Sequence, residues 1–183
     1  MTVPDDEQLA CAIQQGDADA LSLLVEKHYS PLMGYLYRML GGNRPLAEDF
    51  AQETFLKMQQ SIGQYQCPRP FKPWLYAIAS NLARNHFRKA DTRYTQEEDD
   101  TMEQQVTNNP SPEEAAATAD DHRQVIDVLM NLSVQHREVV VLRYYEEHSL
   151  SEIADALGIP VGTVKSRLSI GLKRLRVLME QYA

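Results

Sequence analysis

The chain is poor in cysteine, glycine and aromatic residues, and it contains no long hydrophobic run. Its 183 residues include 2 cysteines, 8 glycines and 9 prolines, which excludes disulfide-rich, collagen-like and mucin-like proteins. The apolar run at 139–142 is bounded by Glu138 and Arg143, and no apolar run of the sequence is long enough to cross a membrane. The first residues, MTVPDDEQ, are acidic where a signal peptide is basic. We therefore expect a soluble, cytoplasmic protein without direct membrane insertion.

Motifs for catalysis and cofactor binding are also scarce. The 5 histidines are scattered, and the chain has no glycine-rich phosphate loop and no pairing of serine or cysteine with histidine. Cys11 and Cys67 stand far apart, and neither has neighbours at metal-ligand spacing. A reduced cytosolic setting fits these cysteines best. The sequence predicts no enzyme, no cofactor and no metal site.

What the chain does contain is charge that is unevenly distributed. The formal net charge is −8, yet residues 95–122 hold nine acids and no lysine or arginine. Segment 69–93 has six cations against one acid, and segment 160–179 has five cations and no acid. Two basic patches on either side of an acidic strip favour a nucleic-acid partner, which the charge of the whole chain conceals.

Helical periodicity dominates, and no stretch alternates apolar and polar residues for long. The pattern predicts helices over 5–15, 18–40, 45–63 and 71–90, and again around 125–132, 139–142, 150–157 and 161–181. Pro31 is expected to break or kink the second of these. The acidic strip lacks aromatic residues and is interpreted as a disordered linker. The predicted fold class is all-α, with two small helical domains, 1–94 and 123–183, joined by a flexible acidic linker, 95–122.

The strongest local signal lies at 149–179. Ser149 is a plausible N-cap that Glu152 completes as a capping box, and Gly158 can end that helix in the left-handed conformation. A second helix is predicted to begin just after Pro160. Two helices joined by a short turn containing glycine form a helix-turn-helix.

The second of these helices has an apolar side and a polar side. Its predicted core face consists of Val164, Leu168, Leu172, Leu175 and Leu178. The other side carries Thr163, Lys165, Ser166, Ser169, Lys173 and Arg174, which can reach phosphates and base edges in a major groove. The plainer interpretation is a solvated face of a helical bundle. Because such a face usually mixes charges of both signs and this one has no acid, DNA contact is the better prediction.

Residues 159–167, IPVGTVKSR, resemble the start of the recognition helix of bacterial sigma factors of the extracytoplasmic-function (ECF) type. The upstream stretch LSVQHREVVVL at 132–142 resembles the first helices of domain 4 in the same family. The resemblance implies that the C-terminal domain is sigma domain 4 and reads the duplex −35 element of promoters. The residues that it assigns to −35 DNA are Thr163, Lys165, Ser166, Arg167, Ser169 and Lys173.

The segment 47–58, AEDFAQETFLKM, places Asp49 and Glu53 four residues apart. Such a pair can ligate a metal, but no histidine or further carboxylate accompanies it, and a solvated acidic face near a helix N-terminus is the plainer alternative. The pattern also resembles the helix of sigma domain 2 that docks on the clamp coiled coil of RNA polymerase. The residues that this resemblance assigns to core polymerase are Asp49, Gln52, Glu53 and Phe55.

The segment that begins at Phe71 interleaves basic with aromatic residues, a pattern that suits single-stranded nucleic acid. Trp74, Leu75 and Ile78 are more simply interpreted as core, with the polar residues facing the other way. The stretch resembles the sigma segment that melts and captures the −10 element, where an asparagine at the place of Asn81 lines a pocket for a flipped base. The set assigned to single-stranded −10 DNA is Lys72, Trp74, Asn81, Arg84, Asn85 and Arg88.

The loop before this segment departs from the family. Relatives often have a glycine and an acid before the Phe-x-x-Trp motif, where this chain has CPRP at 67–70. Many also have arginine where Ala77 and Ser80 stand. We therefore expect the loop that selects the −10 base to be unusual.

The function that these features favour is that of an ECF sigma factor. It would bind core RNA polymerase and promoter DNA, and many relatives are held by an anti-sigma factor. A stand-alone helix-turn-helix regulator with a helical sensor domain is the alternative, and a nucleic-acid-processing enzyme is a weaker one. A regulator binds duplex DNA by itself, whereas a sigma factor requires polymerase.

Overall fold

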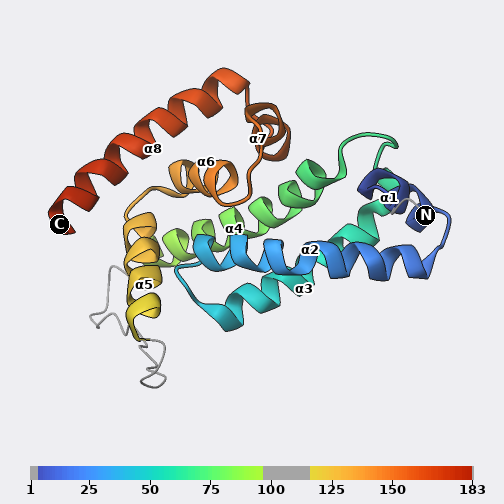
Figure 1. Cartoon of the computed structure of the whole chain (residues 1–183), viewed down its shortest axis with the longest axis horizontal. Coiled ribbons are helices and arrows are strands. Elements are labelled where there is room, and N and C mark those ends of the chain that lie inside the picture. The colour runs from blue at the N-terminus through green and yellow to red at the C-terminus, as the bar shows by residue number, and fades with distance from the viewer. Residues whose placement is uncertain (1–3, 97–115, 183) are drawn as a thin grey trace.

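The computed structural model describes residues 4–96 and 116–182, and within these ranges the chain folds into helices without strands. Figure 1 shows their arrangement. The N-terminal group consists of α1 (Asp6–Gln14), α2 (Ala18–Met39), α3 (Arg44–Ser61), the 3-10 helix η1 (Ile62–Gln64) and α4 (Phe71–Gln96). The C-terminal group consists of α5 (Ala116–Met130), α6 (Val134–Tyr144), α7 (Leu150–Leu157) and α8 (Val161–Tyr182). The all-α prediction is confirmed.

Local capping explains where several helices begin. Asp5 caps α1 in a reciprocal capping box with Gln8, and the Asp17 carboxylate accepts hydrogen bonds from the first turn of α2. Asn43 caps α3. Pro31, which is predicted to break or kink α2, lies inside this helix, which continues through it to Met39, so the proline does not break the helix. The proline is tolerated because α2 is held by packing along its length, including buried Leu24, Leu32 and Leu36.

The ends of the predicted linker are helical. α4 continues through Gln96, and α5 begins at Ala116, so the interval between the helical groups is shorter than 95–122. The rest of the predicted acidic linker, residues 97–115, lies outside the described residues.

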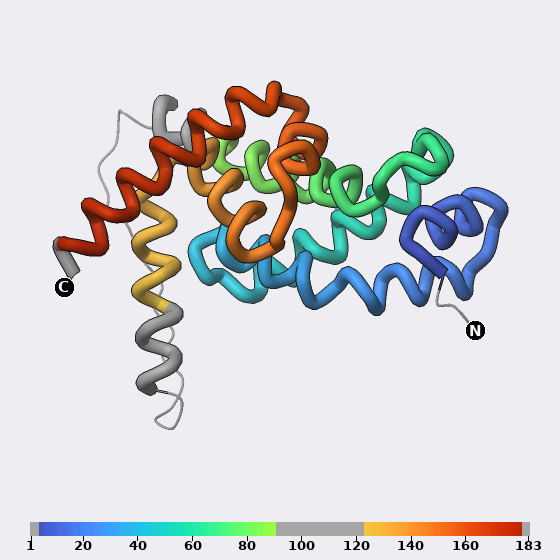
Figure 2. The backbone as a smooth tube through the Cα atoms, turned by 45° about the horizontal axis from the view of Figure 1, so that its top comes forward, coloured from blue at the N-terminus to red at the C-terminus, as the bar shows by residue number. Residues whose placement is uncertain are grey.

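The two helical groups pack directly against each other. In Figures 1 and 2, α6 and α7 lie against α4 and α2, while α8 runs along the outer side of the C-terminal group. One continuous cluster of buried residues links them, from Leu24, Tyr35 and Leu75 in the N-terminal group to Leu142 and Ile153 in the C-terminal group. The two basic segments predicted from the sequence therefore belong to helical groups that are docked in this structure.

Cys11 of α1 and Cys67 of the loop before α4 form a disulfide. The sequence favours a reduced cytosolic setting and does not predict this bond. Nothing in the sequence indicates the pairing, because the two positions are 56 residues apart. Only the packing of α1 beside the loop brings them together. None of the described helices is long and apolar enough to span a bilayer.

Candidate nucleic-acid interface

An acidic surface with one apolar side chain lies on α3. Asp49, Gln52 and Glu53 are exposed, and Leu56 on the same side of the helix is 58% exposed. Lys57 Nζ lies 3.5 Å from Glu53 Oε1, a surface ion pair of small energetic weight. We call Asp49, Gln52, Glu53 and Leu56 the α3 face. Its chemistry suits a basic, partly apolar partner.

Phe55 does not belong to the α3 face. It is only 9% exposed, and its ring stacks on that of Tyr29 with the centroids 6.4 Å apart. Phe55, which the resemblance assigns to core polymerase, thus packs in the core of this structure and is not on the surface beside Asp49 and Glu53. The apolar positions of α3 follow a core stripe with spacings of four, four and three: Ala47, Ala51, Phe55 and Met58. Leu56, one residue on, is the apolar side chain that faces outward.

The polar residues predicted for −10 DNA lie on two stripes of α4, not on one face. One stripe repeats every four residues and faces the C-terminal helical group: Lys72, Tyr76, Ser80 and Arg84. The other has spacings of seven, four and three: Trp74, Asn81, Asn85 and Arg88. We call them the covered stripe and the open stripe. The prediction of a common face for Lys72, Arg84 and the asparagines is wrong.

The covered stripe is bonded to the turn between α6 and α7. Lys72 Nζ donates to the Glu146 carbonyl oxygen at 2.7 Å, and the Tyr76 hydroxyl donates to Glu146 Oε2 at 2.7 Å. Arg38 Nη1 of α2 lies 3.9 Å from Glu146 Oε1. Burial raises the pKa of the Glu146 carboxyl, although Tyr76 and the nearby cations counteract it. Lys72, a predicted −10 contact, is thus engaged within the protein.

Glu138 of α6 lies between two cations that were predicted to contact DNA. Its Oε2 lies 3.4 Å from Arg84 Nε and its Oε1 lies 3.5 Å from Arg167 Nη1, and its side chain is 1% exposed. Burial raises the pKa of this carboxyl to about 7, and both arginines oppose the shift. One buried acid therefore holds one cation of the covered stripe on α4 and one of the helix-turn-helix.

The open stripe faces solvent beside an aromatic cluster. Asn81, Asn85 and Arg88 are exposed, and Trp74 is half-buried. The Trp74 ring centroid lies 5.2 Å from that of Tyr65 and 5.9 Å from that of Phe71. Arg88 donates to Asn85 Oδ1 at 3.0 Å. Amide, guanidinium and aromatic groups side by side can bond base edges, hold phosphates and stack bases.

The helix-turn-helix predicted from the sequence is present. Ser149 and Glu152 form the capping box of α7, and Gly158 ends that helix with a φ of 65°. On α8, Lys165, Ser166, Ser169 and Lys173 are exposed, and Thr163 is half-buried. Arg167 is half-buried as well, because it reaches Glu138. Four of the six residues predicted for −35 DNA thus face solvent.

The predicted core face of α8 is only partly buried. Val164 is fully buried and Leu168 is 8% exposed, whereas Leu172 is 39% exposed. Leu172 and Leu175 line an apolar groove of about 670 Å³ between α5, α6 and α8. The prediction of a continuous core face is wrong at Leu172, because this side chain lines the open groove and not the closed core.

Sequence reasoning missed the residues that join the two helical groups. Arg137 of α6 is 3% exposed, and its Nη1 donates to the Met39 carbonyl at the end of α2 at 2.7 Å. Glu138 and Glu146 were missed as well. The sequence did contain a signal for Arg137 and Glu138. The two residues directly precede the apolar run of α6, and charged side chains on the core face of a helix require partners inside the protein.

Comparison with known proteins agrees with this geometry. Residues 24–93 match the family model of sigma-70 region 2, and residues 128–177 match that of sigma-70 region 4. These ranges include the α3 face, both stripes of α4 and the helix-turn-helix. The two regions together define a sigma-70 type protein.

Relatives of known type span nearly the whole chain. It is 36% identical to the ECF RNA polymerase sigma factor SigW of Bacillus subtilis, over 90% of this chain and 91% of the relative. It is 33% identical to the RNA polymerase sigma-H factor of Pseudomonas aeruginosa, over 92% of this chain and 90% of the relative. The chain belongs to the ECF group of the sigma-70 family and has the function of an RNA polymerase sigma factor. The stand-alone regulator is not favoured.

Solved structures show the same fold. CnrH, in complex with the cytosolic domain of CnrY, has a TM-score of 0.77 with 24% identity, covering 97% of this chain and 99% of CnrH. The sigma factor RpoE of Bartonella quintana, in complex with the anti-sigma factor NepR, has a TM-score of 0.70 with 24% identity, covering 87% of this chain and 96% of RpoE.

Proposed function

We propose that this sigma factor binds core RNA polymerase through the α3 face and reads promoters with two separate surfaces of α4 and α8. The α4 surface is assigned to single-stranded −10 DNA, with Trp74, Asn81, Asn85 and Arg88 on the open stripe. Lys72 and Arg84 join them when the covered stripe is released. The α8 surface is assigned to duplex −35 DNA. Domains 1–94 and 123–183, with the linker 95–122, are the corresponding division of the chain.

The observation that carries this proposal is the engagement of predicted DNA contacts inside the docked protein. Lys72 donates to the Glu146 carbonyl oxygen, while Arg84 and Arg167 lie within 3.5 Å of the Glu138 carboxylate. Three cations predicted for promoter contact are thus bonded within the protein. Region 4 must move off α4 before Lys72 and Arg84 can meet phosphates. Binding to polymerase supplies the interactions that separate the regions, since a partner shifts an equilibrium by its differential affinity for the two states.

An anti-sigma factor is the regulatory partner that we assign. Support comes from the membership of the chain in the ECF group and from the likeness to RpoE, which was solved with the anti-sigma factor NepR. Such a partner would stabilise the docked state, in which Lys72 and Arg84 of α4 are bonded to the C-terminal helical group. The site of action is the cytoplasm, where polymerase and promoter DNA are found, and the chain itself catalyses no reaction.

In vitro transcription with core polymerase and a promoter library tests the proposed function. We expect run-off transcripts only when the chain and core polymerase are both present. The selected promoters should share two elements, one upstream duplex element and one in the melted region. Tight, specific binding of duplex DNA by the chain alone, with no polymerase-dependent transcription, would favour a stand-alone regulator instead.

Reversing charge on the α3 face should impair polymerase binding. We expect Asp49→Arg or Glu53→Arg to weaken binding to core polymerase by about 100-fold, because each replaces attraction to a basic partner by like-charge repulsion. The measurement is titration of labelled chain with core polymerase. Asp127→Arg on α5 is the matched control, since Asp127 is also an exposed acid but lies away from the α3 face. Wild-type affinity in folded Asp49→Arg and Glu53→Arg variants would contradict the docking assignment.

Removing cations from α8 should weaken the upstream contact. For the holoenzyme on duplex promoter DNA, Lys165→Ala with Arg167→Ala should lower affinity about tenfold or more and reduce the slope of log affinity against log salt by about 1–2. Lys165 is exposed and contributes directly, whereas Arg167 must first leave Glu138. Lys27→Ala on α2 serves as the control for loss of a surface lysine. An unchanged affinity and salt slope in the double variant would refute the −35 assignment.

A further inference from the structure

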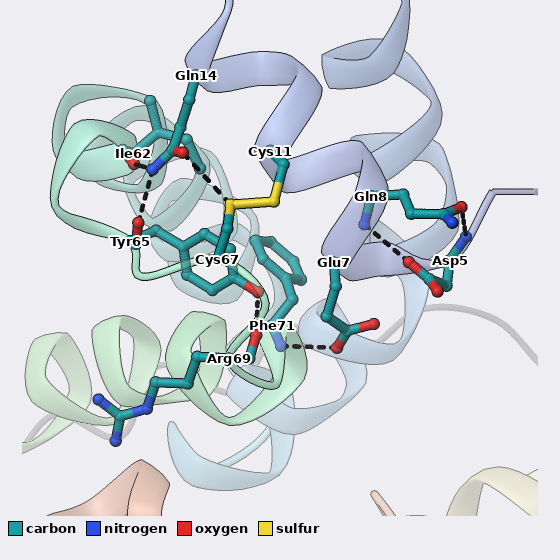
Figure 3. The surroundings of a disulfide bond; sticks show 10 residues. All are labelled: Asp5, Glu7, Gln8, Cys11, Gln14, Ile62, Tyr65, Cys67, Arg69 and Phe71. Carbon is teal, nitrogen blue, oxygen red and sulfur yellow. Dashed lines mark hydrogen bonds between the residues drawn. A yellow bond between two sulfur atoms is a disulfide. The ribbon is translucent and has the colours of Figure 1, made fainter.

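The segment between η1 and α4, residues 65–70, is held by α1 at both of its ends. At the start, the Gln14 side-chain amide donates to the Ile62 and Tyr65 carbonyl oxygens at 2.7 and 2.6 Å. At the end, the Phe71 backbone N–H donates to Glu7 Oε1 at 3.0 Å. Figure 3 shows these bonds on either side of the Cys11–Cys67 disulfide. The covalent link therefore lies in the middle of an interface that hydrogen bonds already define.

The disulfide is open to reagents from solution. Cys67 is exposed and Cys11 is half-buried, and their Cα atoms are 6.0 Å apart, within the usual range for a disulfide. A structural disulfide of a secreted protein is usually sheltered, whereas those of intracellular proteins are mostly transient and respond to redox conditions. An ECF sigma factor works where thiols are kept reduced, so an accessible pair in it calls for a redox explanation.

The surroundings also suit the reduced form. Cys67 Sγ lies 3.3 Å from Gln14 Oε1, a distance at which a thiol can donate a hydrogen bond to the amide oxygen. A disulfide sulfur carries no hydrogen, so this bond exists only when the pair is reduced. Gln14 can thus hold the two backbone carbonyls with its nitrogen and the Cys67 thiol with its oxygen. Reduction replaces the covalent link by a weak hydrogen bond, and the Cys67 thiol still has a partner in the Gln14 amide oxygen.

We propose that Cys11 and Cys67 form a reversible redox site that sets how firmly residues 65–70 are held against α1. The Cys67 thiolate attacks a low-molecular-weight disulfide, forms a mixed disulfide and expels one small thiol. The Cys11 thiolate then attacks the Cys67 sulfur and expels the second small thiol. Two electrons pass from the protein thiols to the small disulfide, whose two released thiols take up the two protons. Excess small thiol reverses both steps.

The state of the pair affects the open stripe through Tyr65. Tyr65 begins the segment, its hydroxyl donates to the Arg69 carbonyl within it, and its ring contacts Trp74. Closing the disulfide restricts the segment before DNA arrives, and a loop that is already ordered loses less entropy on binding. The oxidised form is therefore the better binder of single-stranded −10 DNA. This consequence rests on the proposed function, whereas the redox site itself does not.

A redox titration of the full chain tests the site. The chain is equilibrated with glutathione and glutathione disulfide, free thiols are alkylated, and the products are resolved by mass spectrometry. A tenfold rise in glutathione disulfide at fixed glutathione should raise the ratio of protein disulfide to dithiol tenfold, because each protein disulfide consumes one small disulfide. Cys11→Ser should stop at a mixed disulfide on Cys67. A wild-type chain that stays dithiol, or stays disulfide, at every ratio overturns the proposal.

Hydrogen exchange on the same samples tests the effect on the segment. Amides of residues 65–71 should exchange at least about tenfold faster in the dithiol form, because the cross-link no longer limits local opening. The double variant Cys11→Ser/Cys67→Ser is the matched control and should exchange equally in both buffers. Equal exchange in the two forms of the wild-type chain overturns the mechanical part of the proposal.

Holoenzyme measurements separate the redox effect from the proposed function. On a promoter selected from the library, holoenzyme with the oxidised chain should form about threefold more open complex than holoenzyme with the reduced chain. The double serine variant should show no difference, which controls for redox effects on polymerase. Equal open-complex formation by the two wild-type forms overturns the coupling to −10 DNA. Failure to bind core polymerase in either state refutes the proposed function instead, and the titration and exchange still decide the redox site.

Discussion

Replacing Arg137 with alanine is expected to lower the free energy of unfolding by about 3–5 kcal/mol, because it removes a buried donor that several carbonyl groups share. The Arg137 guanidinium donates to the carbonyl oxygens of Leu129 at 3.1 Å, Met39 at 2.7 Å and Leu132 at 3.0 Å. Burial lowers the pKa of this side chain to about 10, so it stays charged at neutral pH. The guanidinium carbon of Arg137 also lies 5.2 Å from the centroid of the Phe87 ring, which adds a cation–π interaction.

Chemical denaturation of the full chain measures this effect. Arg143→Ala is the matched control on the same helix, because Arg143 is exposed and donates a hydrogen bond to the His148 carbonyl. Its loss should cost about 1 kcal/mol or less. Arg137→Lys should fall between the two, since an ammonium cannot reach all of the carbonyls that the guanidinium bridges. A loss below about 1 kcal/mol for Arg137→Ala would show that water replaces the guanidinium at these carbonyls.

Local features of the sequence predicted local features of the fold well. The capping box at Ser149 and Glu152 and the left-handed Gly158 are each decided within a few residues, so the helix-turn-helix could be foreseen in detail. Phe55 shows the limit of motif matching. The motif assigned it to a partner, but its spacing from Ala51 and Met58 placed it on the core stripe.

The contacts between the helical groups could not be foreseen in this way. Tyr76 bonds an acid 70 residues away, and Cys11 meets Cys67 across 56. Hydrophobic periodicity shows that a helix has a buried side but not which helix covers it. For the same reason Lys72 and Arg84 were assigned to DNA alone, although their α4 stripe also faces region 4. The sequence pattern thus identified the cations, and only the packing revealed the groups that they contact inside the protein.

The buried acid Glu138 should make the protein less stable as the pH rises. Its pKa in the folded chain is about 7, against a usual value of 4.5. Between these values the folded chain binds a proton that the unfolded chain has released, so folding is favoured at low pH and stability is lost as the pH rises. His148 acts in the opposite direction, because burial lowers its pKa to about 4 and the unfolded chain then binds the extra proton. The wild-type profile alone therefore mixes opposing contributions.

Comparison with Glu138→Gln isolates the contribution of the acid. The variant keeps the size and shape of the side chain but cannot ionise, so its free energy of unfolding should exceed that of wild type increasingly from about pH 4.5 to about pH 7 and by a constant amount above. The shift from 4.5 to about 7 corresponds to a change on the order of 3 kcal/mol.

Denaturation at half-unit pH steps measures this difference, with Asp155→Asn on the exposed side of α7 as the control whose curve should parallel that of wild type. Parallel curves for wild type and Glu138→Gln would contradict the assignment of Glu138 as a buried acid.

The pH dependence of Glu138 also affects the release of region 4 from α4. Above about pH 7 the ionised Glu138 attracts Arg84 at 3.4 Å but is poorly solvated. The attraction opposes separation of the two side chains, whereas the cost of burying the charge favours separation. Glu138→Gln removes both contributions. If desolvation dominates, as the raised pKa indicates, region 4 of the variant should stay docked more firmly at pH 8 than that of wild type.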